Sequence, residues 1–569
     1  MMSKHRKTVQ LIFSVSILLL MILPMRIPVT EGDPDILTVP DPYPTIQAAI
    51  NAANASDTIQ VAAGIYYENV IVNKSVTLRG EDSATTIIDA NQTGHGVKMN
   101  ASNIQVHQFT IRNGGNQYAC LYVDSQGGHV IADNVLTGSY CGIDMCECDG
   151  CTIIGNTLYD NGMTGVSFSY SHHNDIVGNN VSESAYGIKG QASNDNIIIN
   201  NTLSQNSYSI YLTQSVRNDI TNNMVSAQTY GIYLLSSDTN DIEDNTVTDS
   251  SIGIYIRDSS GNSVFHNTMR DNSYGLQLAY STNNPVDLNT ASENDWGFRL
   301  YDADSNALTR NTLHENTWGI YFENGATANT LYHNNLIDNV KQVHQGLLNT
   351  WDSGGEGNYW SDYHGLDDGS DGRDAGDGIG DTALPHIGLD SYPLMAIWSE
   401  HELSITTVTS SDTWAYTGWT IYINVTVKNV GRAGTTETFN VTAEYDSYVI
   451  ETKTVTDLPN GANETITFSW TTTDVPPHNN YTIGAVATIL PDEVNTADNA
   501  FINGKVYIKL LGDVNDDGVV DPYDLLDLSK AYGSQPGDAN WSLNCDLNRD
   551  GNVDASDLID LTINYGKTI

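Results

Sequence analysis

The chain has 569 residues and a formal net charge of −45, from 69 acidic and 24 basic side chains. This length exceeds one ordinary domain and predicts three or four. So acidic a surface repels phosphate backbones and anionic membranes, which excludes nucleic acid and membrane surfaces as partners. The charge suits divalent cations, and the alternative is a solvated acidic surface for a salty environment.

Residues 1–31 have the features of an export signal. Three basic residues among the first seven precede an apolar run over 11–23, which is too short to span a membrane. No clear cleavage pattern follows, so an uncleaved N-terminal anchor is the alternative. Glycosylation sequons such as Asn100-Ala101-Ser102 fit export. We therefore expect a secreted, surface-associated protein.

Five of the six cysteines lie between Cys120 and Cys151, and the sixth is Cys545. In an oxidising compartment some of the five are expected to form disulfides. The alternative is a soft-metal site made by Cys146, Cys148 and Cys151.

The middle of the chain repeats with a period of 22 residues. The clearest ladder is Asn174, Asn196, Asn218, Asn240, Asn262, Asn284 and Asn306. A second asparagine ladder starts at Asn179, and aliphatic ladders start at Ile176 and Ile188. A fixed period of roughly 20–50 residues marks a solenoid, and apolar residues alternate within each repeat as they do in strands.

These patterns predict a right-handed parallel β-helix of 22-residue coils, roughly a dozen of them, over residues 59–348. We interpret the asparagine ladders as structural, because stacked amides bond to one another. Residues 32–58 are expected to cap the first coil, since Ile46, Ala49 and Ile50 share an apolar stripe at helical spacing.

Several motifs resemble known β-helix families. Tyr43-Pro44-Thr45-Ile46-Gln47-Ala48-Ala49-Ile50 resembles the opening of pectin-lyase-like β-helices, and the repeats resemble NosD-type carbohydrate-binding and sugar-hydrolase repeats. The Asp/Gly-rich segment 349–400, with Gly357-Asn358-Tyr359-Trp360, resembles the tail of archaeal members. The resemblance implies the fold but leaves the activity open, because this fold hosts lyases, hydrolases, esterases and non-enzymes. The NosD name also suggests copper, for which only His172-His173 offers ligands.

Outward positions of the repeats form two aromatic columns, which suit stacking against sugar rings. The predicted carbohydrate-binding residues are Tyr211, Tyr233, Tyr255, Tyr321, Trp296 and Trp318. The alternative is that stacked aromatic rings only stabilise the ladder.

Catalysis on the β-helix stays an open question at this stage. A hydrolase of O-glycosyl bonds needs two carboxylates, and a lyase needs a base and usually calcium. The candidate catalytic residues are Asp144, Glu147 and Asp149, with Asp124 about one coil away. Such clusters also arise by chance in so acidic a chain.

The segment Asp367–Asp381 interleaves six aspartates with five glycines. Carboxylates supply hard oxygen ligands and glycines let the chain wrap, so further calcium is expected here. The alternative is a flexible acidic loop.

Residues 401–509 alternate Val, Thr and Tyr in short runs, which predicts an Ig-like β-sandwich. Asn429-Val430-Gly431 and Asn495-Thr496-Ala497-Asp498-Asn499 resemble the CARDB family. The resemblance implies a spacer or a weak binding module.

The last segment, 511–569, contains the same calcium-loop pattern twice, starting 33 residues apart, and each loop leads into a short apolar helix. The predicted ligands are Asp513, Asn515, Asp517, Val519, Asp521 and Asp524 in the first loop and Asp546, Asn548, Asp550, Asn552, Asp554 and Asp557 in the second, with Val519 and Asn552 acting through carbonyls.

This duplicated pattern resembles type I dockerins, because the last ligand is Asp where an EF-hand has Glu. The resemblance implies two calcium ions and a cohesin-type protein partner. It also implies that Pro522, Tyr523, Ala555 and Ser556 face the cohesin. Because the two pairs differ, equal binding in two orientations is not expected.

Two functions fit these patterns. One is a secreted carbohydrate-active protein that binds or degrades polysaccharide through its β-helix and docks to cohesin through a calcium-dependent dockerin. The other is a non-catalytic surface adhesin or surface-layer component that binds glycans or only spans distance.

Overall fold

The computed structural model describes residues 34–399, 401–431, 435–491, 493–494 and 496–569. The chain is mostly β, with 48% strand and 7% helix, and contains a β-solenoid of about 15 turns, somewhat more than expected. The chain divides into two compact units, one that ends at Asn240 and one that begins at Asp241. The predicted export signal lies outside the described residues. No helix of the described chain is long and apolar enough to cross a membrane.

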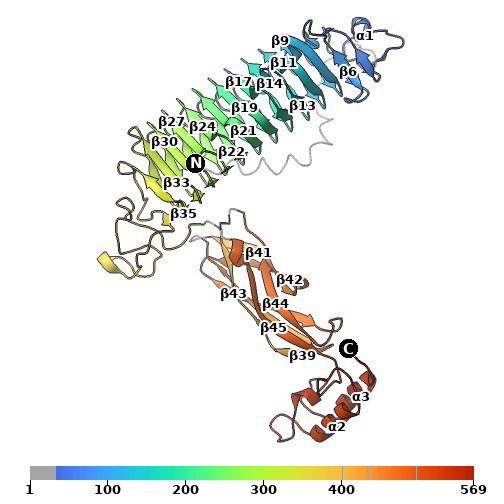
Figure 1. Cartoon of the computed structure of the whole chain (residues 1–569), viewed down its shortest axis with the longest axis vertical. Helices are drawn as coiled ribbons and strands as arrows, with labels where there is room; N and C mark the ends of the chain where they lie inside the picture. Colours follow the sequence, from blue (N-terminus) through green and yellow to red (C-terminus); the bar gives the residue numbers. More distant parts are fainter. Residues whose placement is uncertain (1–33, 400, 432–434, 492, 495) are drawn as a thin grey trace, which may run out of the picture. The chain divides into compact units, whose positions relative to one another are not determined.

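In the first unit each solenoid coil contributes strands to parallel rows, which Figure 1 shows side by side. One row is β1 (Ile36–Val39), β2 (Thr58–Val61), β5 (Thr77–Gly80), β8 (Gln105–His107), β10 (Val130–Ala132), β12 (Thr152–Ile154), β15 (Asp175–Val177), β18 (Ile197–Ile199) and β20 (Asp219–Thr221). The second row is β3 (Gly64–Tyr66), β6 (Thr86–Asp89), β9 (Thr110–Asp124), β11 (Val135–Cys146), β13 (Thr157–Tyr159), β16 (Asn180–Ser182), β19 (Thr202–Thr213) and β21 (Met224–Leu235). The third row is β4 (Val70–Val72), β7 (Val97–Met99), β14 (Thr164–Ser169) and β17 (Tyr186–Gln191), joined by the second halves of β9, β11, β19 and β21.

The second unit begins with solenoid coils of the same kind. Its first row is β22 (Asp241–Glu243), β25 (Ser263–Phe265), β28 (Pro285–Asp287), β31 (Ala307–Thr309) and β34 (Thr330–Tyr332). The second is β23 (Thr246–Thr248), β26 (Thr268–Arg270), β29 (Thr290–Ser292), β32 (Thr312–His314), β35 (Asn335–Ile337) and β37 (Tyr359–Trp360). The third is β24 (Ile252–Arg257), β27 (Tyr274–Ala279), β30 (Trp296–Tyr301), β33 (Trp318–Glu323) and β36 (Lys341–His344).

The start of the solenoid lies earlier in the chain than the sequence suggested. The apolar stripe folds as helix α1 (Ile46–Ala52), capped by the Thr45 side chain. Strand β1 precedes that helix and already pairs with β2. The parallel sheet therefore begins at Ile36, inside the segment expected to be only a cap.

Strand register confirms that the 22-residue step is one coil. Ile176 pairs with Ile198, Ile198 pairs with Ile220, and all three side chains are fully buried. Aliphatic side chains from successive coils thus stack inside the solenoid and exclude water, which is the main stabilising contribution to such a fold.

The asparagine side chains of the ladders form hydrogen bonds with backbone groups at the solenoid corners. The Asn218 side-chain oxygen accepts hydrogen bonds from the backbone nitrogen and side-chain amide of Asn196, at 3.0 and 2.9 Å. Its own amide donates to the carbonyl oxygen of Ser193 at 3.1 Å. A third ladder that the sequence analysis missed does the same, as when Asn272 donates to Asn294 at 3.2 Å.

Substitution Asn218→Ala is expected to lower the free energy of unfolding by about 2 kcal/mol, because it leaves buried donors and acceptors without partners. The measurement is the midpoint of urea unfolding of the whole chain. Asn180, which lies exposed in β16, is the matched control, and Asn180→Ala is expected to change the unfolding midpoint little. Equal effects of the two substitutions would contradict a structural role for the ladder.

The predicted β-sandwich is present after the solenoid. One sheet is β38 (Leu403–Ser410), β40 (Thr420–Asn429) and β43 (Asn463–Thr471); the other is β39 (Trp414–Tyr416), β45 (Ala500–Lys509), β44 (Asn479–Ala487), β41 (Thr436–Tyr445) and β42 (Tyr448–Pro459). In β40, Ile421, Ile423, Val425 and Val427 are all fully buried, which is the alternation expected of a half-buried strand.

The C-terminal segment contains helices α2 (Pro522–Ala531) and α3 (Ala555–Asn564). Short 3-10 helices occur along the chain at η2 (Ser370–Gly372), η3 (Thr496–Asn499) and η4 (Leu543–Cys545). Each of the two α-helices starts with a capping box, formed by Asp521 with Asp524 and by Asp554 with Asp557. The last residue of each predicted calcium loop therefore also fixes the start of a helix.

The six cysteines are all free thiols, so the expectation of disulfides was wrong. Two of these thiols contact polar neighbours: Cys120 Sγ lies 3.0 Å from Ser139 Oγ, and Cys148 Sγ lies 3.1 Å from the Cys146 carbonyl oxygen. Burial raises the pKa of the Cys120 thiol to about 12, which keeps it protonated and unreactive.

Candidate functional site

Asp144 in β11 is the centre of a polar cluster on the third row of the first unit. Strand register places it beside Tyr122 on one neighbouring coil and Ser167 on the other. Burial raises the pKa of its carboxyl group, although Ser167, His95 and Lys189 each act to lower it. Asp144 is therefore a half-buried acid with an imidazole and an ammonium group nearby.

His95, which the sequence analysis did not single out, completes this cluster. Its ring stacks on Tyr122, with 4.4 Å between ring centroids, and its Nδ1 accepts a hydrogen bond from the backbone of Ala119 at 3.0 Å. Because Nδ1 is an acceptor, the proton of the neutral ring resides on Nε2. Burial lowers the pKa of His95, while the charge of Asp144 opposes that effect.

The structure does not bring the other two candidate acids to Asp144. Glu147 and Asp149 are exposed in the turn that follows β11, and Glu147 has a left-handed backbone with φ of 54°. The Asp149 carboxylate accepts a hydrogen bond from the backbone of His172 at 2.6 Å. Asp124 makes an ion pair with Lys98 at 3.5 Å. Asp149 therefore stabilises a turn, and Asp124 is part of an ion pair.

Aromatic side chains stack along the third row of the first unit. The rings of Tyr186 and Tyr208 are 4.8 Å apart, as are those of Tyr208 and Tyr230. Tyr211 and Tyr233 form a parallel column at 5.2 Å, and Tyr233 is only 9% exposed. The two columns thus contact each other, and part of their aromatic surface is used in the ladder itself.

The third row of the second unit has the same character. Tyr274 stacks on Trp296 at 4.6 Å, and Trp318 meets Tyr321 edge-on at 5.4 Å. Tyr255 is 8% exposed, whereas Trp296, Trp318 and Tyr321 are half-buried.

Cations lie over several of these rings. Lys341 Nζ is 4.3 Å from the ring centroid of Trp318, and the Arg299 guanidinium is 5.1 Å from that of Tyr274. In the first unit Lys189 lies 5.0 Å from the centroid of Tyr186. In so acidic a protein, this gathering of cations and half-buried rings makes the third row chemically distinct.

The two predicted calcium loops are folded alike. In the first, the Asp513 carboxylate accepts from the backbone of Asp517 at 3.1 Å and Gly518 at 2.8 Å. Asp524 accepts from Val514 at 2.7 Å and Asp521 at 2.8 Å. Both carboxylates are fully buried.

In the second loop Asp546 and Asp557 take the same positions, and they are 2% and 0% exposed. Four buried carboxylates, together with amide and carbonyl oxygens, form the hard-oxygen donor set that calcium prefers. Pro522, Tyr523, Ala555 and Ser556, which were predicted to face the partner, are all exposed at the starts of α2 and α3.

The Asp/Gly-rich tail has one feature that fits a cation. Asp381 is 3% exposed, and its Oδ2 accepts from the backbone of Gly369 at 2.6 Å. Its Oδ1 is buried without a hydrogen-bond partner among the described residues. Asp367 accepts from the backbone of Gly378 at 2.8 Å, which curls the segment around its carboxylates.

The profiles of three known families match this chain. The profile of the NosD family, described as periplasmic copper-binding protein (NosD), matches residues 50–226 and 207–365. The CARDB profile matches residues 400–503, and the dockerin type I domain profile matches residues 511–564. The chain is thus a β-solenoid protein that carries a type I dockerin, a module that implies binding of calcium and of a cohesin. It belongs to the NosD family.

Similar solved structures include the A-module of mannuronan C-5 epimerase AlgE6 of Azotobacter vinelandii, at 16% identity and a TM-score of 0.42, covering 52% of this chain and 90% of that one. The DFA-IIIase of Arthrobacter chlorophenolicus A6 without its lid matches at 14% identity and a TM-score of 0.40, over 53% and 94%. The CARDB domain of a Pyrococcus furiosus protein in complex with di-metal ions matches at 21% identity and a TM-score of 0.17, over 20% and 90%. Among curated proteins, none matches this chain.

The family description raises the question of copper, and the solenoid residues do not fit it. Within the described chain, one group of three His, Cys, Asp or Glu side chains lies close enough to share an ion, and it is His478, Asp513 and Asp516, outside the NosD match. His172 Nδ1 accepts a hydrogen bond from the backbone of Asn194 at 3.0 Å, and His173 is exposed in a turn. The function that we propose therefore includes no copper chemistry.

Proposed function

We propose that this protein is a secreted glycan-binding protein whose solenoid binds polysaccharide along its third row and whose dockerin attaches it to a cohesin-bearing partner or surface. The observation that carries this proposal is the set of half-buried aromatic rings on the third row of each unit, several of which have a cation over the ring. Sugar rings stack their apolar faces on such rings, and polar neighbours bind their hydroxyls. Lys189 and Lys341 on this row favour an acidic polysaccharide over a neutral one.

The test is retention of the purified whole chain on a panel of acidic and neutral insoluble polysaccharides. Trp318→Ala is expected to weaken binding about tenfold, since roughly 1.4 kcal/mol of ring contact is lost. Tyr159→Ala is the matched control, because Tyr159 is 40% exposed but lies in β13 on the second row. Equal retention of both variants would remove the third row as the binding surface.

The same chain can act on the bound polysaccharide at Asp144. A half-buried acid whose pKa burial has raised, beside a neutral imidazole and an ammonium group, is suited to proton transfer in a glycan hydrolase or lyase. The second candidate function is a non-catalytic adhesin, which is favoured by the separation of Glu147 and Asp149 from Asp144. Release of reducing or unsaturated sugar ends by the whole chain decides between the two.

Calcium is proposed at three places: one ion in each dockerin loop and one at the tail segment. The third site is supported by the buried Asp381 Oδ1, which lacks a partner among the described residues. Calorimetric titration of the whole chain with calcium is expected to give one ion fewer in Asp381→Asn than in the control Asp352→Asn. An unchanged ion count would assign the tail to a calcium-free loop.

A further inference from the structure

The β-sandwich and the dockerin share one hydrophobic core. Tyr416 of β39 is fully buried, and its hydroxyl lies 3.3 Å from the carbonyl oxygen of Asp513 and 2.9 Å from that of Asn544. The indole of Trp419 donates to the carbonyl oxygen of Leu547 at 2.7 Å. Asp513 is the first residue of the first calcium loop, and Leu547 is the second residue of the second calcium loop. The sandwich therefore contacts both loops through buried donors.

The fourth residue of each loop also faces the sandwich, with opposite charge in the two loops. Asp516 lies 3.5 Å from Lys509 and accepts from the Tyr507 hydroxyl at 3.3 Å. Its counterpart Arg549 pairs with Asp412 and lies 4.7 Å from the ring centroid of Trp419. Both loop residues have left-handed backbones, with φ of 63° and 64°, so the loops present them in the same way.

This charge pattern permits one docking orientation. Exchanging the two loops would bring Arg549 to Lys509 and Asp516 to Asp412, and both contacts would be repulsive. Opposite charges close together stabilise a contact, whereas like charges in a desolvated contact repel each other and destabilise it. The sandwich therefore distinguishes the two otherwise similar halves of the dockerin.

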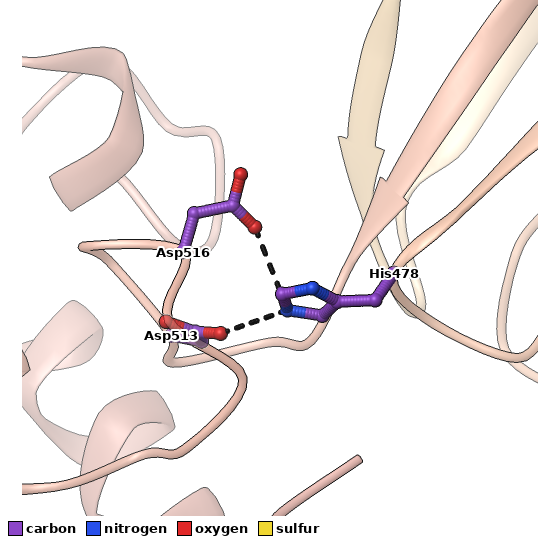
Figure 2. A group of neighbouring side chains, drawn as sticks. All are labelled: His478, Asp513 and Asp516. Atoms are coloured by element: carbon purple, nitrogen blue, oxygen red, sulfur yellow. Dashed lines mark hydrogen bonds and ion pairs between the residues drawn. The ribbon is translucent and has the colours of Figure 1, made fainter.

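The first loop has an additional partner from the sandwich, which Figure 2 shows. His478 Nε2 lies 3.0 Å from Asp513 Oδ2, the same oxygen that accepts from the backbone of Gly518 at 2.8 Å. The other ring nitrogen lies 3.0 Å from the Tyr507 hydroxyl, which fixes the ring. In the second loop, within the described chain, Asp546 Oδ2 accepts from Gly551 at 3.0 Å and has no imidazole partner.

We propose that the β-sandwich is an integral part of the calcium-binding unit: it docks on the two loops in a single orientation, and His478 positions the Asp513 carboxylate for the ion of the first loop. Two donors on Oδ2 hold the carboxylate so that Oδ1 faces the loop. Partners that orient a metal ligand in this way typically change metal affinity by about 10–100-fold. Calcium binding at the first loop and docking of the sandwich therefore stabilise each other, because each requires the same carboxylate orientation.

The docked sandwich leaves the cohesin-facing residues free. Tyr523 is 66% exposed, and Pro522, Ala555 and Ser556 are exposed as well. The cohesin thus meets a dockerin that already has a bound partner on its loop side. This inference rests on calcium binding by the dockerin, and it does not depend on the glycan function.

The experiment is calorimetric titration of the whole chain with calcium. His478→Ala is expected to weaken binding of the first-loop ion about 10–100-fold and to leave the other ions unchanged. His478→Gln, which keeps an N–H donor, is expected to retain most of the affinity, and His364→Ala, at an exposed histidine of the tail, is expected to have no effect. If His478→Ala binds every ion as the parent protein does, the positioning role is overturned.

A charge exchange tests the orientation. Arg549→Asp is expected to increase hydrogen exchange at the amides of β39 and β45, and Asp412→Arg in the same chain is expected to restore protection. No increase in the single variant would overturn the docked arrangement. A parent protein that binds no calcium at the dockerin would instead overturn the calcium proposal itself, and the two failures are therefore distinguishable.

Discussion

Chelation of calcium is expected to abolish both the fold of the dockerin and its binding to cohesin. The segment is short, and its two helices bury few apolar side chains, among them Leu528 and Leu561. Without an ion, the fully buried carboxylates of Asp524 and Asp557 have no basic side chain paired with them in the described part of the chain. Burying unbalanced charges costs several kcal/mol (roughly), so in modules of this kind ion binding and folding are one event.

The variant Asp513→Ala with Asp546→Ala is expected to lose both dockerin ions in calorimetry and to show rapid hydrogen exchange throughout α2 and α3. Cohesin binding is expected to fall below detection in the same variant. Asp474→Ala changes an exposed sandwich aspartate and serves as the control. An unchanged ion count in the double variant would mean that these loops are not the calcium sites.

The solenoid was predictable from sequence because each coil repeats the same local chemistry. Ile176, Ile198 and Ile220 occupy one interior position of successive coils, and Asn196 and Asn218 occupy one corner. The third asparagine ladder, with Asn272, Asn294 and Asn316, is equally periodic in the second unit, so its 22-residue step was the signal that could have revealed it. Periodicity of side-chain type is thus enough to give both the fold and the register where coils have equal length.

Features outside the period were not predictable in this way. His95 belongs to coils of unequal length, where Thr77 pairs with Gln105 and Gln105 with Val130, so no column alignment places it beside Tyr122. His478 contacts Asp513 across two modules, and nothing periodic links them. The disulfide prediction failed because spacing in the sequence does not by itself place two thiols in bonding geometry, and all six cysteines are free.

Asp144→Asn is expected to remove sugar release by the whole chain, with a loss of about 10²–10⁴-fold if the carboxyl group transfers a proton in the reaction. The substitution keeps the shape of the side chain and removes the transferable proton. Asp149→Asn is the matched control, because Asp149 is exposed in the adjacent turn and serves the backbone of His172. Release that persists in Asp144→Asn would place the chemistry elsewhere, and no release by the parent protein would favour the adhesin.

The pH dependence separates a catalytic loss from unfolding. Burial raises the pKa of Asp144, so this acid stays protonated to higher pH than an exposed aspartate, and activity as a general acid is expected to fall as pH rises through that raised pKa. For the same reason Asp144 contributes stability below the ordinary aspartate pKa and loses it as pH rises through the folded-state value. Asparagine carries no charge at any pH. The variant is therefore expected to be at least as stable as the parent protein at neutral pH while lacking activity, a combination that misfolding cannot produce.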